Sequence, residues 1–239
     1  MSRIRRVLTD RYADHYARVN AELNPESYVG RSVKDMELMY GSLISSLPAG
    51  SKVLDLGCGT GLLLHWLSQQ PGIIPVGVDS SISQVEHAKQ TLPDVDIFRE
   101  DGLKYLQTHP DTFAGIFCLD VLEHIPEEDL LEWVETARSA LQAGGFLFCR
   151  APNAANLAGN YGRYIDLTHQ RSFTSASMVQ LLEAGGFREC RIVPIRSARI
   201  MGNFRLILEH ILHRILFRIV GSGLERVFTT DICAVAFKN

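Results

Sequence analysis

Three glycines at alternate positions follow directly on an apolar stretch, and an acidic residue stands two positions before the first of them. The stretch reads Val53-Leu54-Asp55-Leu56-Gly57-Cys58-Gly59-Thr60-Gly61. Glycines in a turn between a strand and a helix let the backbone bend sharply and approach a ligand closely, because no Cβ stands in the way. The spacing is GxGxG and not the GxGxxG of a dinucleotide loop. A carboxylate beside such a turn would repel a pyrophosphate, so the motif favours a cationic ligand.

Two further acidic residues stand at the ends of the next two predicted strands. Asp79 ends the strand predicted over 73–78, 24 positions after Asp55, and Asp101 follows a weak strand at 96–99. An acid about 20 residues after a glycine turn is placed to accept both hydroxyls of a ribose, and Asp101 is placed to accept from an adenine amino group. Each residue alone would more often be a helix N-cap. Three acids at successive strand ends together predict a ligand that carries a nucleoside.

These motifs resemble those of class I S-adenosylmethionine-dependent methyltransferases. The resemblance covers about residues 52–237 and is reinforced by Asp120-Val121-Leu122-Glu123-His124-Ile125-Pro126 and by Ala143-Gly144-Gly145-Phe146. It implies an α/β fold, a doubly wound Rossmann-like sheet of seven strands, mostly parallel with an antiparallel last strand. It also implies S-adenosyl-L-methionine as the cofactor, which carries an ammonium and a sulfonium and no phosphate. The residues assigned to the cofactor are Asp55, Gly57, Cys58, Gly59 and Gly61 around the methionine part, Asp79 and Ser80 at the ribose, Asp101 and Gly102 at the adenine, and Leu119 and Asp120 on the floor of the site.

Candidate residues for the methyl acceptor lie in two places. His124 follows the fourth predicted strand, at the sheet edge where doubly wound folds bind ligands, and is the first candidate for the base that an alcohol acceptor needs. The alternative is that it only shapes the loop. An insertion over 151–173 follows the fifth strand, and long loops in compact domains are usually functional. It supplies His169 as a second candidate base, and the substrate-binding candidates Tyr161, Arg163, Tyr164, Asp166 and Arg171, unless it is simply a solvated loop.

The acceptor class is narrowed by two further patterns. The position after the fourth strand reads Leu119-Asp120-Val121-Leu122 and lacks the [DNS]-P-P-[YFW] motif of exocyclic-amine methylation in DNA. Residues 164–174 and 181–187 resemble a subgroup often encoded with enzymes of cell-surface polysaccharide biosynthesis. This implies O-methylation of a sugar, a glycolipid or another small hydroxylated acceptor. Two alternatives stay open: a quinone-type or other natural-product O- or N-methyltransferase, and a non-catalytic methyltransferase-fold binding module.

Composition limits the remaining classes. Hydrophobic residues make up 46% of the 239, charged residues 21%, and the net charge is −3, so the chain lacks the basic footprint of a general nucleic-acid binder. The five cysteines are widely spaced, without a zinc-like pattern, which predicts free thiols, no metal and a cytoplasmic location. The acceptor is therefore expected to be a small molecule or a glycan.

The domain organisation predicted is an N-terminal helical cap over 1–50, with a helix at 32–47, and a methyltransferase domain over 51–239. Near 203–220, apolar residues recur at helical spacing among basic ones, which predicts an amphipathic helix. Most such helices face a core, so packing on the sheet or on a second copy in a homodimer is favoured. Peripheral contact with a membrane surface is the alternative.

Overall fold

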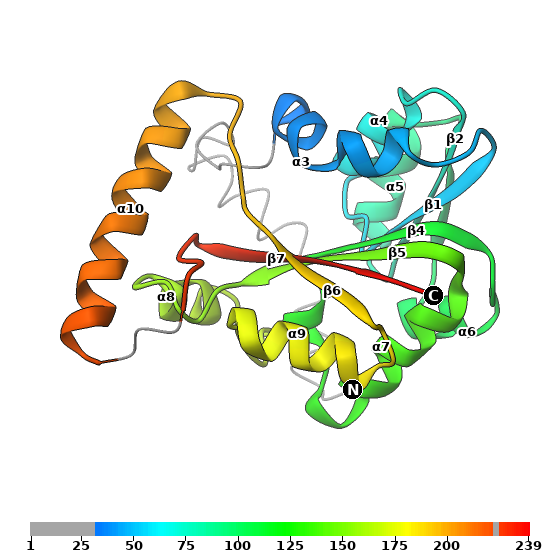
Figure 1. Ribbon diagram of the computed structural model, residues 1–239. Helices are drawn as coiled ribbons and strands as arrows, with labels where there is room; N and C mark the ends of the chain where they lie inside the picture. Colours follow the sequence, from blue (N-terminus) through cyan, green and yellow to red (C-terminus); the bar gives the residue numbers. More distant parts are fainter. Residues whose placement is uncertain (1–31, 222–224) are drawn as a thin grey trace.

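A seven-stranded sheet forms the centre of the computed structural model, which describes residues 32–221 and 225–239 (Figure 1). The strand order is β3-β2-β1-β4-β5-β7-β6. β7 is antiparallel to β5 and β6, and the other neighbours are parallel, which confirms the predicted fold class. The strands are β1 (Ser51–Leu56), β2 (Ile73–Asp79), β3 (Asp96–Arg99), β4 (Phe113–Leu119), β5 (Leu141–Pro152), β6 (Glu189–Val193) and β7 (Asp231–Phe237).

Helices cover both faces of the sheet. One face carries α3 (Val33–Ser45), α4 (Leu62–Ser68) and α5 (Ile82–Thr91), and the other α6 (Gly102–Gln107), α7 (Glu127–Ala140) and α9 (Ser175–Ala184) (Figure 1). Parallel strands buried on both faces are expected to be almost wholly apolar. The sequence of β4, FAGIFCL, meets this condition, since all of it but the last residue is buried. Trp66 of α4 and Trp133 of α7 are buried in the cores on opposite faces.

The carboxyl ends of four strands meet at one edge of the sheet. Leu56 at the end of β1 pairs with Val78 of β2 and with Cys118 of β4, and Asp79 pairs with Arg99 of β3. The segments that follow these strands therefore start side by side. They contain the glycine turn, Asp79, Asp101 and the 3-10 turn η2 (Leu122–His124).

The described part of the predicted N-terminal cap contains α3. It begins after Ser32, whose side chain accepts a hydrogen bond from Asp35 N at 3.1 Å, close to the helix predicted at 32–47. The rest of the predicted cap, residues 1–31, lies outside the described residues. Within the described residues, 32–221 and 225–239, no helix is both long and apolar enough to cross a membrane.

The insertion at 151–173 is closed at its base. Phe173 N donates to Pro152 O and Ala154 N donates to Phe173 O, at 2.9 and 2.8 Å. Between these ends the chain forms α8 (Gly159–Tyr164) and returns beside η2, because Gln170 N donates to Glu123 O at 2.6 Å. The segment is thus a tied loop beside the sheet edge that carries the site.

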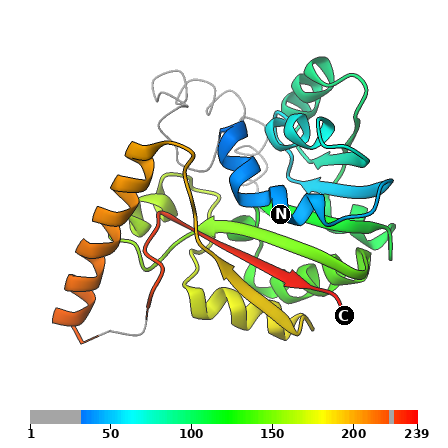
Figure 2. The same ribbon diagram turned by 45° about the horizontal axis from the view of Figure 1, so that its top comes forward.

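The late amphipathic helix differs from its prediction in orientation. α10 (Ile200–Ile219) starts slightly earlier than expected and stands at the side of the molecule where α8 lies (Figure 1, Figure 2). Most of its apolar side chains are exposed, and His213 is its one buried residue. The expectation that its apolar face packs on the sheet is therefore wrong.

Candidate active site

The glycine turn after β1 holds a left-handed backbone that glycine alone adopts readily. Gly57 and Gly59 have φ angles of +78° and +53°. A Cβ at Gly57 would lie 2.5 Å from Cγ2 of Val121, so the turn also packs tightly against the loop after β4. Gly59 N donates to Oδ2 of Asp79 at 2.9 Å, and Ser81 N donates to Oδ1 at 2.8 Å. Each carboxylate oxygen keeps accepting capacity toward a ligand.

Asp55 lies beneath this turn with a second carboxylate nearby. It is only 3% exposed, and burial together with Asp79 raises its pKa to about 7. Among the described residues, no basic side chain forms an ion pair with it. A buried Gln84 oxygen also lacks a hydrogen-bond partner within the described chain and lies 3.8 Å from the Cβ position of Gly59. Two carboxylates and an unused acceptor around an open turn fit a cationic ligand that donates hydrogen bonds.

The other two acids predicted at the cofactor have structural partners. Asp101 caps α6, where its Oδ1 accepts from Lys104 N at 3.1 Å. Asp120 has a φ of +58° and receives two hydrogen bonds from Arg150, Nε to Oδ1 at 2.9 Å and Nη2 to Oδ2 at 2.6 Å. Their roles at the adenine and on the floor of the site stay predictions, as do those of Ser80, Gly102 and Leu119. Sequence reasoning missed Arg150, although an arginine in the apolar stretch Phe146–Ala151 calls for a buried partner.

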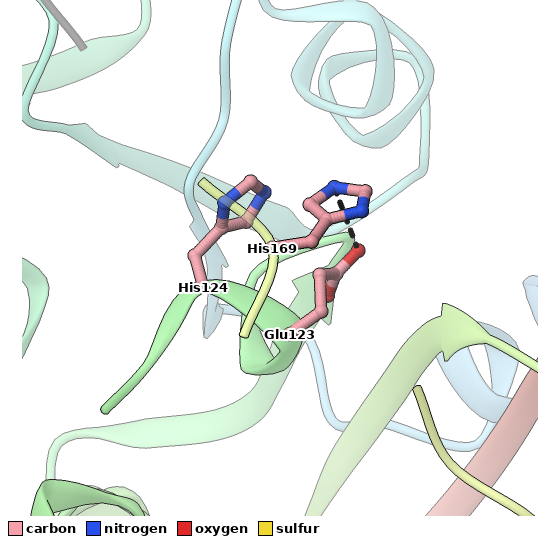
Figure 3. Close-up of side chains that lie close together, drawn as sticks. All are labelled: Glu123, His124 and His169. Carbon is pink, nitrogen blue, oxygen red and sulfur yellow. Dashed lines mark ion pairs between the residues drawn. The ribbon is translucent and has the colours of Figure 1, made fainter. Parts of the chain in front are cut away.

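The two candidate bases, predicted from separate segments, lie together. The rings of His124 and His169 are 4.6 Å apart at an interplanar angle of 72° (Figure 3). Glu123 lies beside them, with its Oε1 4.0 Å from Nε2 of His169. Burial and the nearby Asp120 raise the pKa of Glu123 well above its usual range, which favours a neutral carboxyl over a charged pair. Sequence reasoning assigned no role to Glu123, and the available signal was its place directly before His124 in the loop after β4.

Hydrogen bonds determine which nitrogen of each ring carries the proton. Thr168 Oγ1 lies 2.7 Å from Oδ1 of Asp166 and 2.7 Å from Nδ1 of His124. The hydroxyl has a single proton, and a carboxylate can only accept it, so Nδ1 of His124 must donate to the hydroxyl oxygen. Nδ1 of His169 faces Gly162 O at 2.9 Å and must donate as well. In both rings the lone pair is therefore on Nε2.

The remaining acceptor candidates do not converge on the histidines. Tyr161 and Tyr164 are 68% and 70% exposed. Arg163 stacks on the Tyr164 ring, with its Cζ 4.9 Å from the ring centroid. Asp166 is linked to His124 through Thr168, and Arg171 is half-buried. The substrate-binding assignments of these residues stay predictions.

Comparison with known proteins decides the family. Residues 33–190 match the sequence model of a family described as a methyltransferase domain. The chain belongs to this family. It is an enzyme that uses S-adenosyl-L-methionine to transfer a methyl group.

Several proteins similar in sequence are named as ubiquinone biosynthesis O-methyltransferases. This methyltransferase is 29% identical over 104 residues to a ubiquinone biosynthesis O-methyltransferase of Saccharophagus degradans, a match that covers 42% of the chain and 43% of the relative. It is 33% identical over 105 residues to the protein of the same name from Histophilus somni, covering 41% and 43%. The chain thus matches less than half the length of these relatives.

Solved structures share the fold. An S-adenosylmethionine-dependent methyltransferase from Archaeoglobus fulgidus superposes with a TM-score of 0.64 at 22% identity, over 87% of this chain and 95% of that one. The Haemonchus contortus phosphoethanolamine N-methyltransferase 2, crystallised with S-adenosyl-L-methionine, has a TM-score of 0.59 at 14% identity, over 90% and 59%. At such identities the likeness concerns the fold alone.

Asp79 provides a direct test of the cofactor site. We expect Asp79→Ala to weaken binding of S-adenosylmethionine by about 1–3 kcal/mol, because charged hydrogen bonds to the ribose are lost. Isothermal titration calorimetry measures the change, and an unaltered melting temperature would show that the turn is intact. Unchanged affinity in a folded variant would remove Asp79 from the cofactor site.

The raised pKa of Asp55 predicts a pH dependence of cofactor binding. Below about pH 7 the free methyltransferase carries a protonated Asp55, whereas a cation favours the carboxylate, so binding must release a proton. Affinity therefore falls as the pH falls, by roughly tenfold per unit below the pKa. Titrations at about pH 6 and about pH 7.5 should differ roughly tenfold, and Asp55→Asn should bind more weakly with little pH dependence. Equal affinity of the wild type at both values would contradict this prediction.

Proposed function

We propose that this methyltransferase methylates a hydroxyl oxygen of a small ring-bearing acceptor, of the quinone type. The observation that carries the proposal is His124, whose Nδ1 is fixed by the chain through Thr168 to Asp166 so that its lone pair is on Nε2. A base held in one tautomer by a carboxylate is what removal of a hydroxyl proton needs. Val121, three residues earlier in the same loop, packs against Gly57, which supports a position of this loop next to the glycine turn.

The protein's own part in the reaction is positioning and proton removal. The cofactor supplies a methyl group on a positively charged sulfur, and its transfer is an in-line displacement that depends on alignment. Nε2 of His124 takes the hydroxyl proton as the oxygen attacks. The tied loop 151–173 brings Asp166 and Thr168 to His124, and it excludes water when it closes over the acceptor.

Two observations rank the phenolic and the sugar acceptors. The relatives named above are ubiquinone biosynthesis O-methyltransferases, which favours a phenolic acceptor. The exposed rings of Tyr161 and Tyr164, beside Arg163, are flat polar-edged surfaces of the kind that pack on sugars. Together with the resemblance to the polysaccharide-associated subgroup, they make O-methylation of a sugar or glycolipid the second candidate.

A competition between acceptors tests the proposal. The full chain with S-adenosylmethionine is offered a prenylated dihydroxybenzene and a nucleotide-linked sugar, and the methylated product is identified by mass spectrometry. We expect kcat/KM for the phenol to exceed that for the sugar at least tenfold. A preference for the sugar would establish the second candidate. Tight cofactor binding without turnover on either compound would favour a binding module.

A further inference from the structure

α10 is amphipathic in the opposite sense to most surface helices, because its apolar side faces away from the protein. We call this side the outer face of α10. It consists of side chains that recur every three or four residues and are each at least half exposed, namely Phe204, Ile207, Leu208, Ile211, Leu212, Ile215 and Ile219. Exposed apolar surface of this extent marks a site of interaction with another surface.

Hydrogen bonds on the inner side fix this rotation of the helix. His213 is 2% exposed, its Nδ1 lies 2.7 Å from Glu209 O, and its Nε2 accepts from Leu157 N at 2.7 Å. Asn156 Nδ2 also donates to Oε1 of Glu209 at 2.6 Å. The helix is thus attached to the tied loop 151–173 by hydrogen bonds, and turning its apolar side inward would break these bonds.

Charge selects the partner of the outer face. Glu209 is the only acidic residue in α10, and it points inward. Arg205, Arg214 and Arg218 are exposed, and within the described residues they form no ion pair with an acid. An apolar stripe with cations along it matches the boundary between headgroups and acyl chains of an anionic bilayer. We propose that the outer face of α10 docks on an anionic phospholipid surface, with the helix axis in the plane of that surface.

Two other partners fit less well. A symmetric dimer through this face would pair the same patch on both copies, which brings arginines together with no acid between them. Like the other helices in the described part of the chain, α10 is not long and apolar enough to cross a bilayer.

Docking would bring the tied loop 151–173 to the lipid surface. Leu157 and Leu167, from the tied loop 151–173, are 56% and 75% exposed. A hollow of about 370 Å³ lies between residues 156–158 and α10, lined in part by Leu208 and Leu212. An acceptor with an apolar tail would thus reach the enzyme from the membrane. This last step depends on the proposed function, whereas the docking of α10 does not.

Vesicle co-sedimentation of the full chain tests the docking without any acceptor. We expect partitioning onto vesicles that contain phosphatidylglycerol, weak partitioning onto phosphatidylcholine alone, and a decrease at high salt. Replacing Arg205 and Arg214 by Ala should lower partitioning onto the anionic vesicles about 25-fold, from about a fivefold contribution per basic residue. The double change Ile211→Glu with Ile215→Glu should lower it by about 100-fold or more.

Leu131→Glu is the matched control. Leu131 is also an exposed apolar residue, 43% exposed, but it lies on α7, away from α10 (Figure 1). This variant should partition as the wild type does. Unchanged cofactor affinity of the α10 variants would show that they fold. Equal partitioning of all variants, or no partitioning of the wild type, would overturn the proposal. So would a stable dimer that the isoleucine changes convert to monomers.

Discussion

His124→Ala should lower the turnover of this methyltransferase about 100-fold or more, while its affinity for S-adenosylmethionine stays nearly unchanged. The expected loss is that of a general base, because the ring that takes the acceptor proton is removed while Asp55 and Asp79 are untouched. Single-turnover kinetics with a phenolic acceptor measure the chemical step directly. Near wild-type rates in such an experiment would show that the acceptor needs no base.

Thr168→Val separates positioning from proton transfer at the same site. It removes the hydroxyl that links His124 to Asp166 and keeps the imidazole, so we expect a smaller loss of turnover than for His124→Ala and a shifted pH profile of turnover.

A chelator serves as a second control. One ligand atom from each of Glu123, His124 and His169 lies within 4.8 Å of the others, close enough for all three to bind one cation. Because the sequence predicts no metal, turnover should be the same with and without the chelator.

Asp120→Ala should destabilise the cofactor-free protein by about 3 kcal/mol, because it leaves the guanidinium of Arg150 buried without its counter-charge. The side chains of Arg150 and Asp120 are 10% and 29% exposed, so the estimate is at the lower end of the range for buried pairs. For a chain of this length the melting temperature should fall by roughly 10 °C. Denaturant unfolding followed by circular dichroism gives the free energy of unfolding.

Two further variants identify the cause of that loss. Asp120→Asn keeps an acceptor and tolerates the φ of +58°, so it should lose less than Asp120→Ala. Combining Asp120→Asn with Arg150→Met removes both charges, and stability should return toward that of the wild type. A double variant as unstable as Asp120→Ala would show that the buried charge is not the cause.

The fold was predictable because the signals for it are local. Near-continuous apolar strands such as β4, the three glycines after β1 and acids at strand ends each follow from a few neighbouring residues. These signals also place Asp55 and Asp79 at one edge, since parallel strands end together. The boundaries of α10 were less predictable, because the turn before it depends on Asn203, whose side chain bonds to the backbone of Ser197.

The arrangement of the histidines was not predictable from sequence. Each was a candidate base by itself, but their meeting depends on the return of the tied loop to η2, through the bond from Gln170 N to Glu123 O. The pair of Asp120 and Arg150 likewise joins residues 30 positions apart across two strands. The direction of the apolar side of α10 depends on bonds to Asn156 and Leu157. Such long-range contacts leave no periodic pattern in the chain.

The place of β7 has a consequence for how the protein is made. β7 lies between β5 and β6: Phe237 of β7 pairs with Phe146 of β5, and the other edge of β7 pairs with β6. A strand that is synthesised after both of its neighbours therefore occupies an interior position in the sheet. Until residues 231–237 have left the ribosome, β5 has an open edge and β6 has nothing to pair with. Open apolar edges recruit other chains, and such long-range pairing is slow to form. Exposure of that edge during translation should therefore limit the yield of folded protein more than the stability of the finished domain does.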